Sequence, residues 1–383
     1  MYNLAGYGEM IADEIRTGAY ARALECAVRP GSTVLDIGAG SGIMSLLDCQ
    51  YGARKVYAIE PDEVIEVARE LARENGFADR IEFIREVSTK VKLHERVDVI
   101  VADLRGVLPL FRSHLPSVAD ARERFLAEGG VMIPRRDTLW ACVVESPEAV
   151  QNLHGAWTNG NRSLDFDAAR RYATNTWTRC RVNPDNLLAE PQRWAEIDYA
   201  QSLPANRKGS SDFRIARRST GHGLVVWFDT ELAEGIGYSN APGQPKLIYG
   251  MAFFPWPKDV ALDDGDRVSV SLRADLVGED YVWSWESRVA GAAAGELKAE
   301  FRQSSFMGKP RSLDSLRRVA DSFRPALGED GEIDRLVLER MNGERSLGEI
   351  ARELAERYPE SFPTAREALT RAGELSEKYS RRS

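Results

Sequence analysis

Residues 34–43, Val-Leu-Asp-Ile-Gly-Ala-Gly-Ser-Gly-Ile, decide how the first third of this chain folds. The apolar run 33–37 leads into a turn in which Gly38, Gly40 and Gly42 alternate with small residues, and a helical pattern follows. Glycine lets a backbone turn sharply and approach a ligand without a Cβ atom in the way. This order of strand, turn and helix predicts the nucleotide-binding edge of a parallel sheet.

Two acidic residues accompany the glycines. Asp36 precedes Gly38 by two residues, and Glu60 ends the next apolar run, 18 residues after Gly42. An acid at that place can accept the hydroxyls of a ribose, whereas Asp36 would repel a pyrophosphate and suits a cationic amino-acid ligand. We therefore predict S-adenosylmethionine as the cofactor; the plain alternative is an ordinary loop rich in glycine. The residues assigned to the cofactor site on this basis are Asp36, Gly38, Gly40, Gly42, Glu60, Pro61, Val87 and Ser88.

Short apolar runs alternate with amphipathic stretches on both sides of the turn. A helical pattern covers residues 10–28, and another covers 63–75 with apolar residues at helical spacing. This alternation is typical of a parallel sheet with helices on its faces, so we predict an α/β, Rossmann-like domain over residues 1–136. The expected strands are 33–37, 56–59, 81–84 and 97–102.

After residue 137 the pattern changes to apolar residues at every second position, as in 138–144 and 223–228. Such runs between glycine, proline and asparagine clusters predict an antiparallel β domain over 137–305. Residues 150–195 interrupt it with a weakly helical stretch and are expected to form an arm. Residues 310–383 are helical again, and Ser346 with Glu349 forms a predicted capping box.

The composition limits the class of protein. The chain has 383 residues and a formal net charge of −8, which argues against nucleic acid as a partner. Its four cysteines and four histidines are scattered, so we expect neither a metal site nor a disulfide framework. No signal peptide and no apolar run of the roughly 18 residues of a membrane helix is present. We expect a cytoplasmic protein that does not enter a membrane.

Residues 7–300 resemble the protein arginine methyltransferases. The resemblance rests on 7–17, 52–56, Glu60, 102–115, 125–134, 222–229 and 239–242. It implies a Rossmann-like domain that binds S-adenosylmethionine, a β-barrel, a dimerisation arm within 150–195, and therefore a homodimer. In that family the arginine that matches Arg16 binds the methionine carboxylate of the cofactor.

The chain departs from the family where the methyl acceptor binds. The family holds the target guanidinium between two glutamates of one loop; the first falls on Asp103 and the second on Arg112. The family's Thr-His-Trp loop falls on residues 247–249, and the aromatic helix that closes over the cofactor is largely missing from residues 1–6. With Arg105 added, the loop has lost a negative charge and gained two positive ones, so it should repel an arginine acceptor.

These charges suggest another set of roles. Arg105 and Arg112 could clamp a carboxylate of the acceptor by paired hydrogen bonds, and Tyr249 could line the same site. Asp103, at the end of a strand, could position the nucleophile, and His114 could take its proton. We therefore predict Asp103 and His114 as catalytic residues and the other three as substrate-binding residues.

Plainer interpretations exist for two of them. Arg112 could pair with a helix acid such as Asp120 or Glu123, and His114 could serve packing or lie on the surface. Both stay open on the sequence alone.

Residues 325–380 resemble, more weakly, the PqqD-like peptide-binding domains of ribosomal peptide pathways, through 330–334, 338–350 and 357–359. That family begins with a β-hairpin onto which a leader peptide adds a strand, but residues 306–330 show no clear hairpin pattern. The alternative is a small helical bundle with a structural role.

Taken together, the sequence predicts a methyltransferase that modifies a peptide or an amino-acid-like molecule in a biosynthetic pathway. The alternatives are a true protein arginine methyltransferase and a catalytically silent scaffold that binds a peptide. A precursor or leader peptide would be the partner of the C-terminal domain.

Overall fold

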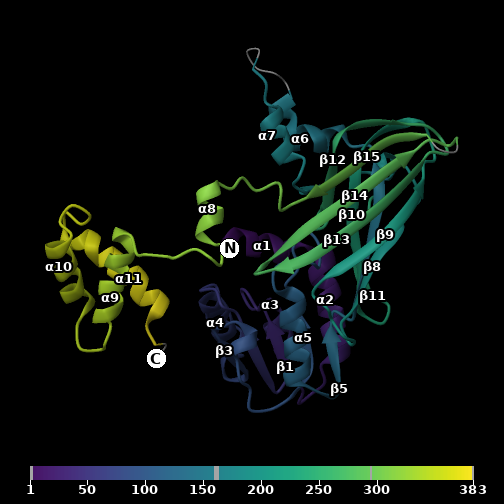
Figure 1. Ribbon diagram of the computed structural model, residues 1–383. Helices are drawn as coiled ribbons and strands as arrows, with labels where there is room; N and C mark the ends of the chain where they lie inside the picture. The colour runs from purple at the N-terminus through teal and green to yellow at the C-terminus, as the bar shows by residue number, and fades with distance from the viewer. Residues whose placement is uncertain (1–2, 159–163, 294–295, 382–383) are drawn as a thin grey trace. The chain divides into compact units, whose positions relative to one another are not determined.

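The computed structural model describes residues 3–158, 164–293 and 296–381. Its first part is built on a parallel sheet with strand order β3-β2-β1-β4-β5 (Figure 1). The central strand β1 is buried along its whole length, as its apolar run requires in a sheet covered on both faces. The α/β prediction is confirmed. The strands are β1 Thr33–Ile37, β2 Lys55–Ile59, β3 Ile81–Ile84, β4 Val97–Ala102 and β5 Leu126–Ile133.

Helices α3, α4 and α5 connect the strands of this part and pack against its sheet, whereas two further helices precede the first strand. In α4 (Ile65–Glu74) the buried residues Ile65, Ala68 and Ala72 recur at the spacing of one helical face. The helical pattern over 10–28 is not one helix, however. It is divided into α1 (Leu4–Ala12) and α2 (Glu14–Ala27), because Asp13 leaves the helical conformation and caps α2 by accepting the backbone N–H of Arg16 at 3.1 Å. The remaining helices are α3 Ile43–Gln50 and α5 His114–Phe125.

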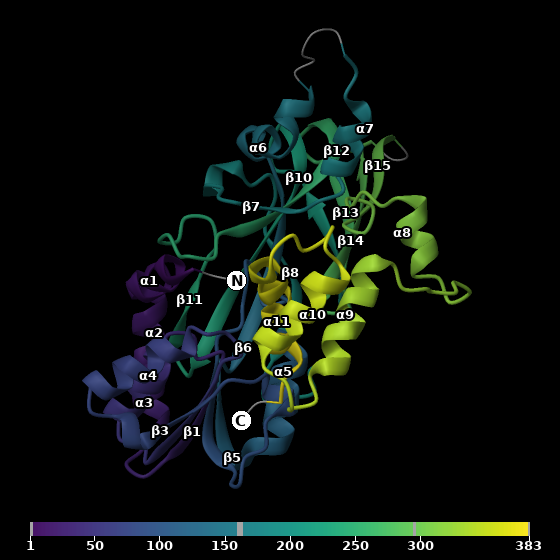
Figure 2. The same cartoon turned by 90° about the vertical axis from the view of Figure 1, so that its left-hand side faces the viewer.

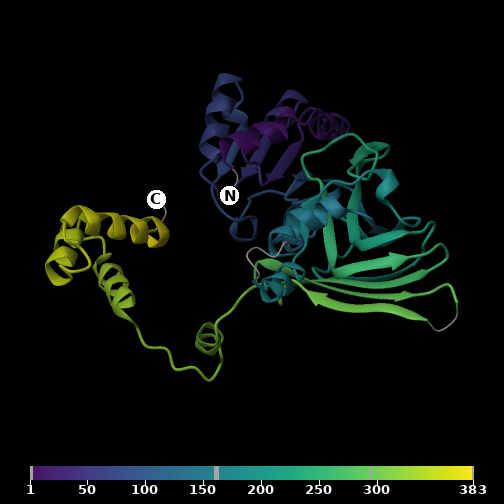
Figure 3. The ribbon, with the colours of Figure 1, turned by 90° about the horizontal axis from the view of Figure 1, so that it is seen from above.

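The second part is antiparallel. Among the described residues its strands form the orders β7-β12-β10-β6-β8, with β11 beside β10, and β15-β14-β13-β9. Strand β8 contacts β9 and β12 contacts β15, so the sheets meet along their edges and enclose an aromatic core of Phe254, Trp283 and Trp285. Figure 3 shows these strands (teal and green) beside the purple and blue nucleotide-binding part. The strands are β6 Arg136–Val144, β7 Thr178–Cys180, β8 Gln192–Asp198, β9 Arg207–Arg214, β10 Ser219–Ala233, β11 Ile236–Ser239, β12 Met251–Leu262, β13 Arg267–Val277, β14 Asp280–Ala290 and β15 Leu297–Ser304.

The expected arm is shorter than the range 150–195. Helices α6 (Pro147–Thr158) and α7 (Asp167–Ala173) project from the end of the β domain in Figures 1 and 2, whereas β7 and β8 return to the sheet. The arm exposes large apolar side chains: Trp157 is 44%, Leu164 62% and Tyr172 45% exposed. Sequence periodicity missed the boundary because β7 is a strand of three residues, too short to show alternation.

The chain divides into two compact units, Met1–Pro310 and Arg311–Ser383. The second unit packs α9 (Glu329–Arg340), α10 (Leu347–Arg357) and α11 (Ala365–Tyr379) around a small apolar core, and α8 (Leu313–Arg318) precedes them. The predicted capping box forms, since Ser346 and Glu349 bond to each other's backbone N–H. The described residues of this unit contain no strand, so the PqqD-like mode in which a leader peptide adds a strand has no edge to use there.

Within the described residues, no helix has the length and apolar character needed to cross a membrane.

Candidate functional site

The glycine-rich turn joins β1 to α3 and cannot accommodate side chains at its three glycine positions. Gly38, Gly40 and Gly42 have φ of +73°, +54° and +88°, a region that residues with a Cβ atom rarely adopt. A Cβ atom on Gly38 would also run into the side chain of Leu104, and one on Gly40 would lie 2.7 Å from the ring of Tyr7. The turn therefore brings bare backbone and the N-terminus of α3 to the edge of the sheet, as a site for a nucleoside ligand requires.

The two predicted acids lie at the carboxyl ends of β1 and β2. Asp36 is buried and accepts the hydroxyl of Ser45 at 2.6 Å; burial raises its pKa to about 7. The Glu60 carboxylate accepts the N–H of Gly40 and the N–H of Asp62, both at 3.0 Å, and burial raises its pKa as well. Glu60 thus bonds directly to the glycine turn from the neighbouring strand, at the edge where a ribose is predicted.

Three further predicted cofactor residues follow the ends of neighbouring strands at the same edge. Pro61 comes directly after Glu60 and is exposed. Val87 and Ser88 follow β3; Val87 is 38% exposed, and Ser88 is buried with its carbonyl accepting an N–H of Arg124 at 2.8 Å. Their position beside the acids suits contacts to a nucleobase, and their assignment stays a prediction.

Arg16 reaches the site from α2. Its side chain is 7% exposed, and its Nε donates to Asp103 at 2.7 Å and to the hydroxyl of Tyr249 at 3.0 Å. A further N–H of the guanidinium bonds Asp103, and another donates to the carbonyl of Met10 at 3.3 Å. Arg16 is therefore held at the junction of the parallel sheet and the β domain.

Asp103 follows β4 directly and lies at the centre of a buried cluster. Its carboxylate accepts Arg16, the Tyr249 hydroxyl at 2.7 Å and Nη1 of Arg105 at 3.2 Å. Burial alone would raise the pKa of Asp103, but the two guanidinium groups outweigh it and hold that pKa well below its usual range. Asp103 is thus ionised, and it is a weak base.

Arg105 corrects the prediction of a carboxylate clamp. Its side chain is fully buried, and all five of its N–H donors are used. They bond both oxygens of Asp137 at 2.8 and 3.0 Å, the Tyr20 hydroxyl at 2.6 Å, Thr230 at 2.8 Å and Asp103. Arg105 therefore joins the loop after β4 to strands β6 and β10 and has no donor left for a ligand.

His114 also has a different place from the predicted general base. It begins α5, is 1% exposed, and its Nε2 lies 2.8 Å from the hydroxyl of Tyr199, which donates in turn to Asp137 at 2.5 Å. Burial, helped by the charge of Arg105, lowers the pKa of His114 to about 4. The structure thus supports the packing interpretation.

Arg112 lies in the loop that precedes His114 but differs from His114 in its exposure. It is exposed and adopts φ of +42°, a strained conformation for a residue with a Cβ atom, whereas His114 is buried. Within the described residues Arg112 makes no hydrogen bond or ion pair, because Asp120 pairs with Arg124 and Glu123 with Arg122. The alternative pairing with those helix acids is therefore not formed.

Tyr249 is buried beside Asp103. Its ring stacks on Tyr238 with an interplanar angle of 11°, and the two hydroxyls are 3.2 Å apart. Burial raises the pKa of Tyr249, so its hydroxyl stays protonated and can donate to Asp103. Tyr249 faces the charged cluster, as expected of a residue that lines the acceptor site.

Sequence reasoning missed several members of the cluster: Tyr20, Asp137, Tyr199, Thr230 and Tyr238. Tyr20 could have been found, since it lies one helical turn after Arg16 on α2. The others come from strands and loops far along the chain, and no local pattern marks them.

Comparisons with known proteins agree with this geometry. Residues 17–134 match the family model described as Ribosomal protein L11 methyltransferase (PrmA). Protein arginine N-methyltransferase 6 of Xenopus laevis is 32% identical over 237 residues, which cover 57% of this chain and 68% of the relative. The chain belongs to the protein arginine N-methyltransferase family. It is accordingly an S-adenosylmethionine-dependent methyltransferase.

Two further comparisons, one with a relative and one with a solved structure, agree with this assignment to the family. An arginine N(omega)-methyltransferase of Streptomyces achromogenes subsp. streptozoticus is 30% identical over 272 residues, 69% of this chain and 74% of the relative. The structure of protein arginine methyltransferase 10 of Arabidopsis thaliana has a TM-score of 0.71 and 25% identity, and the match covers 79% of this chain and 97% of that one. The match to this structure confirms the fold of a Rossmann-like part followed by antiparallel sheets.

Proposed function

We propose that this methyltransferase acts on an amino-acid-like or peptide acceptor that carries a carboxylate. The observation that carries the proposal is Arg112, an exposed arginine where the family has the second glutamate that holds a guanidinium. Arg112 makes no ion pair within the described residues, so its charge is available to a ligand. The name of the Streptomyces relative supports an amino acid as one such acceptor.

The cofactor would be held at the edge formed by β1, β2 and β3. Glu60 would accept the ribose hydroxyls, the backbone of Gly38 and Gly40 would approach the methionine part, and Arg16 would bind its carboxylate. Asp36 would support this arrangement from beneath the turn. Bound S-adenosylmethionine supplies an electrophilic methyl group on a cationic sulfur.

The acceptor site differs in charge from one built for a guanidinium. Asp103 is ionised, but Arg16 and Arg105 already neutralise it, and Arg112 adds a positive charge to the same loop. An acceptor that carries only positive charge would be repelled, whereas one that also carries a carboxylate would be attracted. Because Asp103 is a weak base and His114 is buried away from the acceptor, Asp103 would orient the nucleophile, and the nucleophile's proton would leave to water. Alignment is the main contribution that methyl transfer to a good nucleophile needs.

A radiolabel assay tests this function. The purified protein is incubated with methyl-labelled S-adenosylmethionine and free amino acids, a small-molecule extract, acidic peptides or an arginine-rich peptide. We expect label in an acceptor that carries a carboxylate, and at least a tenfold loss of that transfer in Arg112→Glu. The matched control Arg214→Glu changes an exposed arginine of strand β9 in the β domain, outside the edge assigned to the cofactor. Unchanged transfer in Arg112→Glu would refute the role of this loop.

A second candidate is a true protein arginine methyltransferase. It is favoured by the acid retained at Asp103 and by the name of the Xenopus relative. In that case the arginine-rich peptide takes the label and Arg112→Glu increases transfer, which is the opposite outcome.

We further propose that the arm of α6 and α7 mediates dimerisation, since Trp157, Leu164 and Tyr172 expose apolar surface there. Light scattering should find a dimer that Trp157→Glu dissociates.

The C-terminal unit remains a candidate for peptide recognition through its helices. Deletion of this unit would then abolish the labelling of a peptide acceptor but leave the labelling of small molecules unchanged.

A further inference from the structure

We propose that Arg179 and Arg181 form an anion-binding site beside the acceptor site and bind a carboxylate of the methyl acceptor. This inference rests on the proposed function, because it names the part of the protein that recognises the acceptor's negative charge. Two neighbouring arginines are well suited to this, since each guanidinium can form paired hydrogen bonds with a carboxylate.

Both arginines are held in place by the loop that carries Tyr249. Arg179 donates to the carbonyl of Ile248 at 2.6 Å, and Arg181 donates to the carbonyl of Leu247 at 2.6 Å. The stem of Arg179 also lies so close to Gly250 that a Cβ atom there would approach Nε to 2.8 Å. The two side chains are thus ordered against the backbone.

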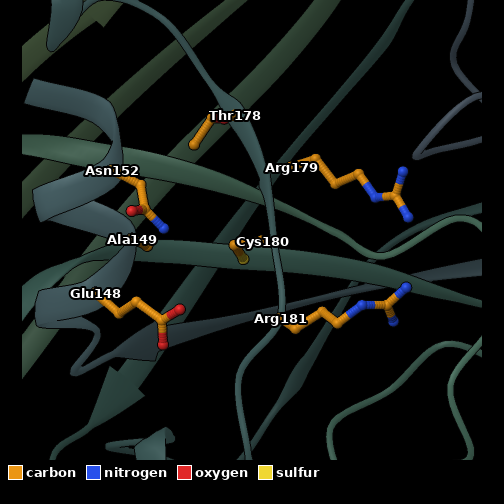
Figure 4. Close-up of a pocket in the computed structure, with 7 residues that line it drawn as sticks. All are labelled: Glu148, Ala149, Asn152, Thr178, Arg179, Cys180 and Arg181. Carbon is orange, nitrogen blue, oxygen red and sulfur yellow. The ribbon is translucent and has the colours of Figure 1, made fainter.

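They point to the same side of the chain. Figure 4 shows both guanidinium groups on one side of strand β7, whereas Glu148 and Asn152 of α6 lie on the other side with Cys180. This is the expected result of strand geometry, in which residues i and i+2 share a face. Glu148, the acid drawn in Figure 4, lies on the opposite side of β7 from the two guanidinium groups.

Within the part of the chain that the structure describes, no ion pair neutralises the positive charge of these two arginines, and both side chains are exposed. Desolvation, followed by the charge of Arg179, lowers the pKa of Arg181, as expected for like charges held close together. The carboxylate of Asp13 is near, but it is already bonded to the N–H groups of Ile248 and Arg16. Each arginine uses one N–H in the bonds to the loop and has others for an anion.

The pair lies a short way from the reacting centre. The loop 247–249 connects the two: its carbonyls at Leu247 and Ile248 accept the arginines, and the hydroxyl of Tyr249 donates to Asp103 at 2.7 Å. An acceptor with its nucleophile near Asp103 could therefore reach the arginines with a carboxylate several bonds away. This geometry fits the α-carboxylate of a free amino acid or an acidic side chain of a peptide.

Measurement of peptide binding, which does not depend on methyl transfer, tests the proposed anion site. Fluorescence anisotropy compares fluorescein-labelled Gly-Glu-Glu-Glu with Gly-Gln-Gln-Gln on the protein saturated with S-adenosylhomocysteine. We expect wild type to prefer the acidic peptide by at least tenfold, which is the effect of a charge-assisted bond of about 1.4 kcal/mol. Arg179→Gln/Arg181→Gln should lose the preference, and Arg179→Lys/Arg181→Lys should keep part of it.

The chain offers a matched control. Arg214 and Arg267 are exposed and face each other across β9 and β13, so their double glutamine variant removes the same charge elsewhere. It should keep the full preference. The inference is overturned if Arg179→Gln/Arg181→Gln binds the acidic peptide as wild type does, or if the control loses the preference equally. Unchanged affinity for S-adenosylhomocysteine in every variant shows that the fold is intact.

Transfer assays then separate the two sources of the carboxylate. A preference for L-arginine over L-argininamide that the double glutamine variant loses identifies the α-carboxylate. A lost preference for peptides with glutamate over glutamine identifies an acidic side chain. If none of these acceptors is methylated, the proposed acceptor class is wrong, and the anisotropy ratio still decides whether the anion site exists.

Discussion

Asp137 offers the most direct test of whether the buried charges stabilise this protein. Its carboxylate is fully buried, accepts two N–H groups of Arg105 at 2.8 and 3.0 Å, and accepts the Tyr199 hydroxyl at 2.5 Å. Asp137→Asn keeps the size but removes one of the two counter-charges of Arg105. Breaking a buried ion pair costs about 3–5 kcal/mol, and because Asp103 remains we expect a loss near the lower end, about 3 kcal/mol.

The assay is thermal unfolding followed by circular dichroism. At about 2 °C per kcal/mol for a unit of this size, Asp137→Asn should melt about 6 °C lower than wild type. Arg105→Met should lose a similar amount, and the double variant should lose at least about 2 kcal/mol less than the sum, because the partners fail together.

An exposed pair provides the control. Arg193 and Glu196 are 62% and 38% exposed, and Arg193→Gln should change the stability by no more than about 0.5 kcal/mol. A melting temperature of Asp137→Asn within 1 °C of wild type, or strict additivity with Arg105→Met, would refute the reasoning.

Three further predictions concern titration and cofactor binding. The pKa of Asp36 is raised from 3.8 to about 7, so the folded state holds this proton more tightly and its stability falls as pH rises between those values. The melting temperature of Asp36→Asn should therefore rise relative to that of wild type as the pH increases from 5 to 8. A difference in melting temperature that stays constant with pH would contradict this. The pKa of His114 is lowered from 6.5 to about 4, so its contribution to stability is present above about 6.5 and is lost as pH falls to 4. His114→Gln should lower the melting temperature, and this loss relative to wild type should become smaller from pH 7 to pH 5 in the same thermal unfolding experiments. A loss that becomes larger would show that the histidine is charged in the folded state. Glu60→Gln should weaken S-adenosylhomocysteine binding about 10- to 100-fold in calorimetry, whereas the exposed control Glu63→Gln should not. If Glu60→Gln binds as tightly as wild type, Glu60 does not hold the ribose.

Local patterns were enough to predict the glycine turn and the edge of the sheet that we assign to the cofactor. Gly38, Gly40 and Gly42 are constrained by a sharp turn between a strand and a helix, and Glu60 follows the next strand, so all of them belong to one stretch of the chain. The buried strands of the parallel sheet could be predicted for the same reason, because a strand covered on both faces is a continuous apolar run.

The acceptor side depends on tertiary structure. Arg105 and His114 looked like ligand-binding groups because their charges stood alone in the loop after β4. Their partners Asp137 and Tyr199 lie in or beside β6 and β8, more than 30 residues away, and only the packing of the β domain against the parallel sheet brings them together. Burial then decides their roles, since a fully bonded arginine and a neutral buried histidine cannot reach a substrate.

The sequence by itself therefore determined the family, the cofactor edge and the loss of the second glutamate at Arg112. Only the tertiary structure decided which charges face a ligand, because exposure and pairing depend on residues that are distant along the chain. Arg179 and Arg181 show this clearly. In the sequence they are two arginines separated by one residue, and in the fold both bond to the loop that holds Tyr249 against Asp103.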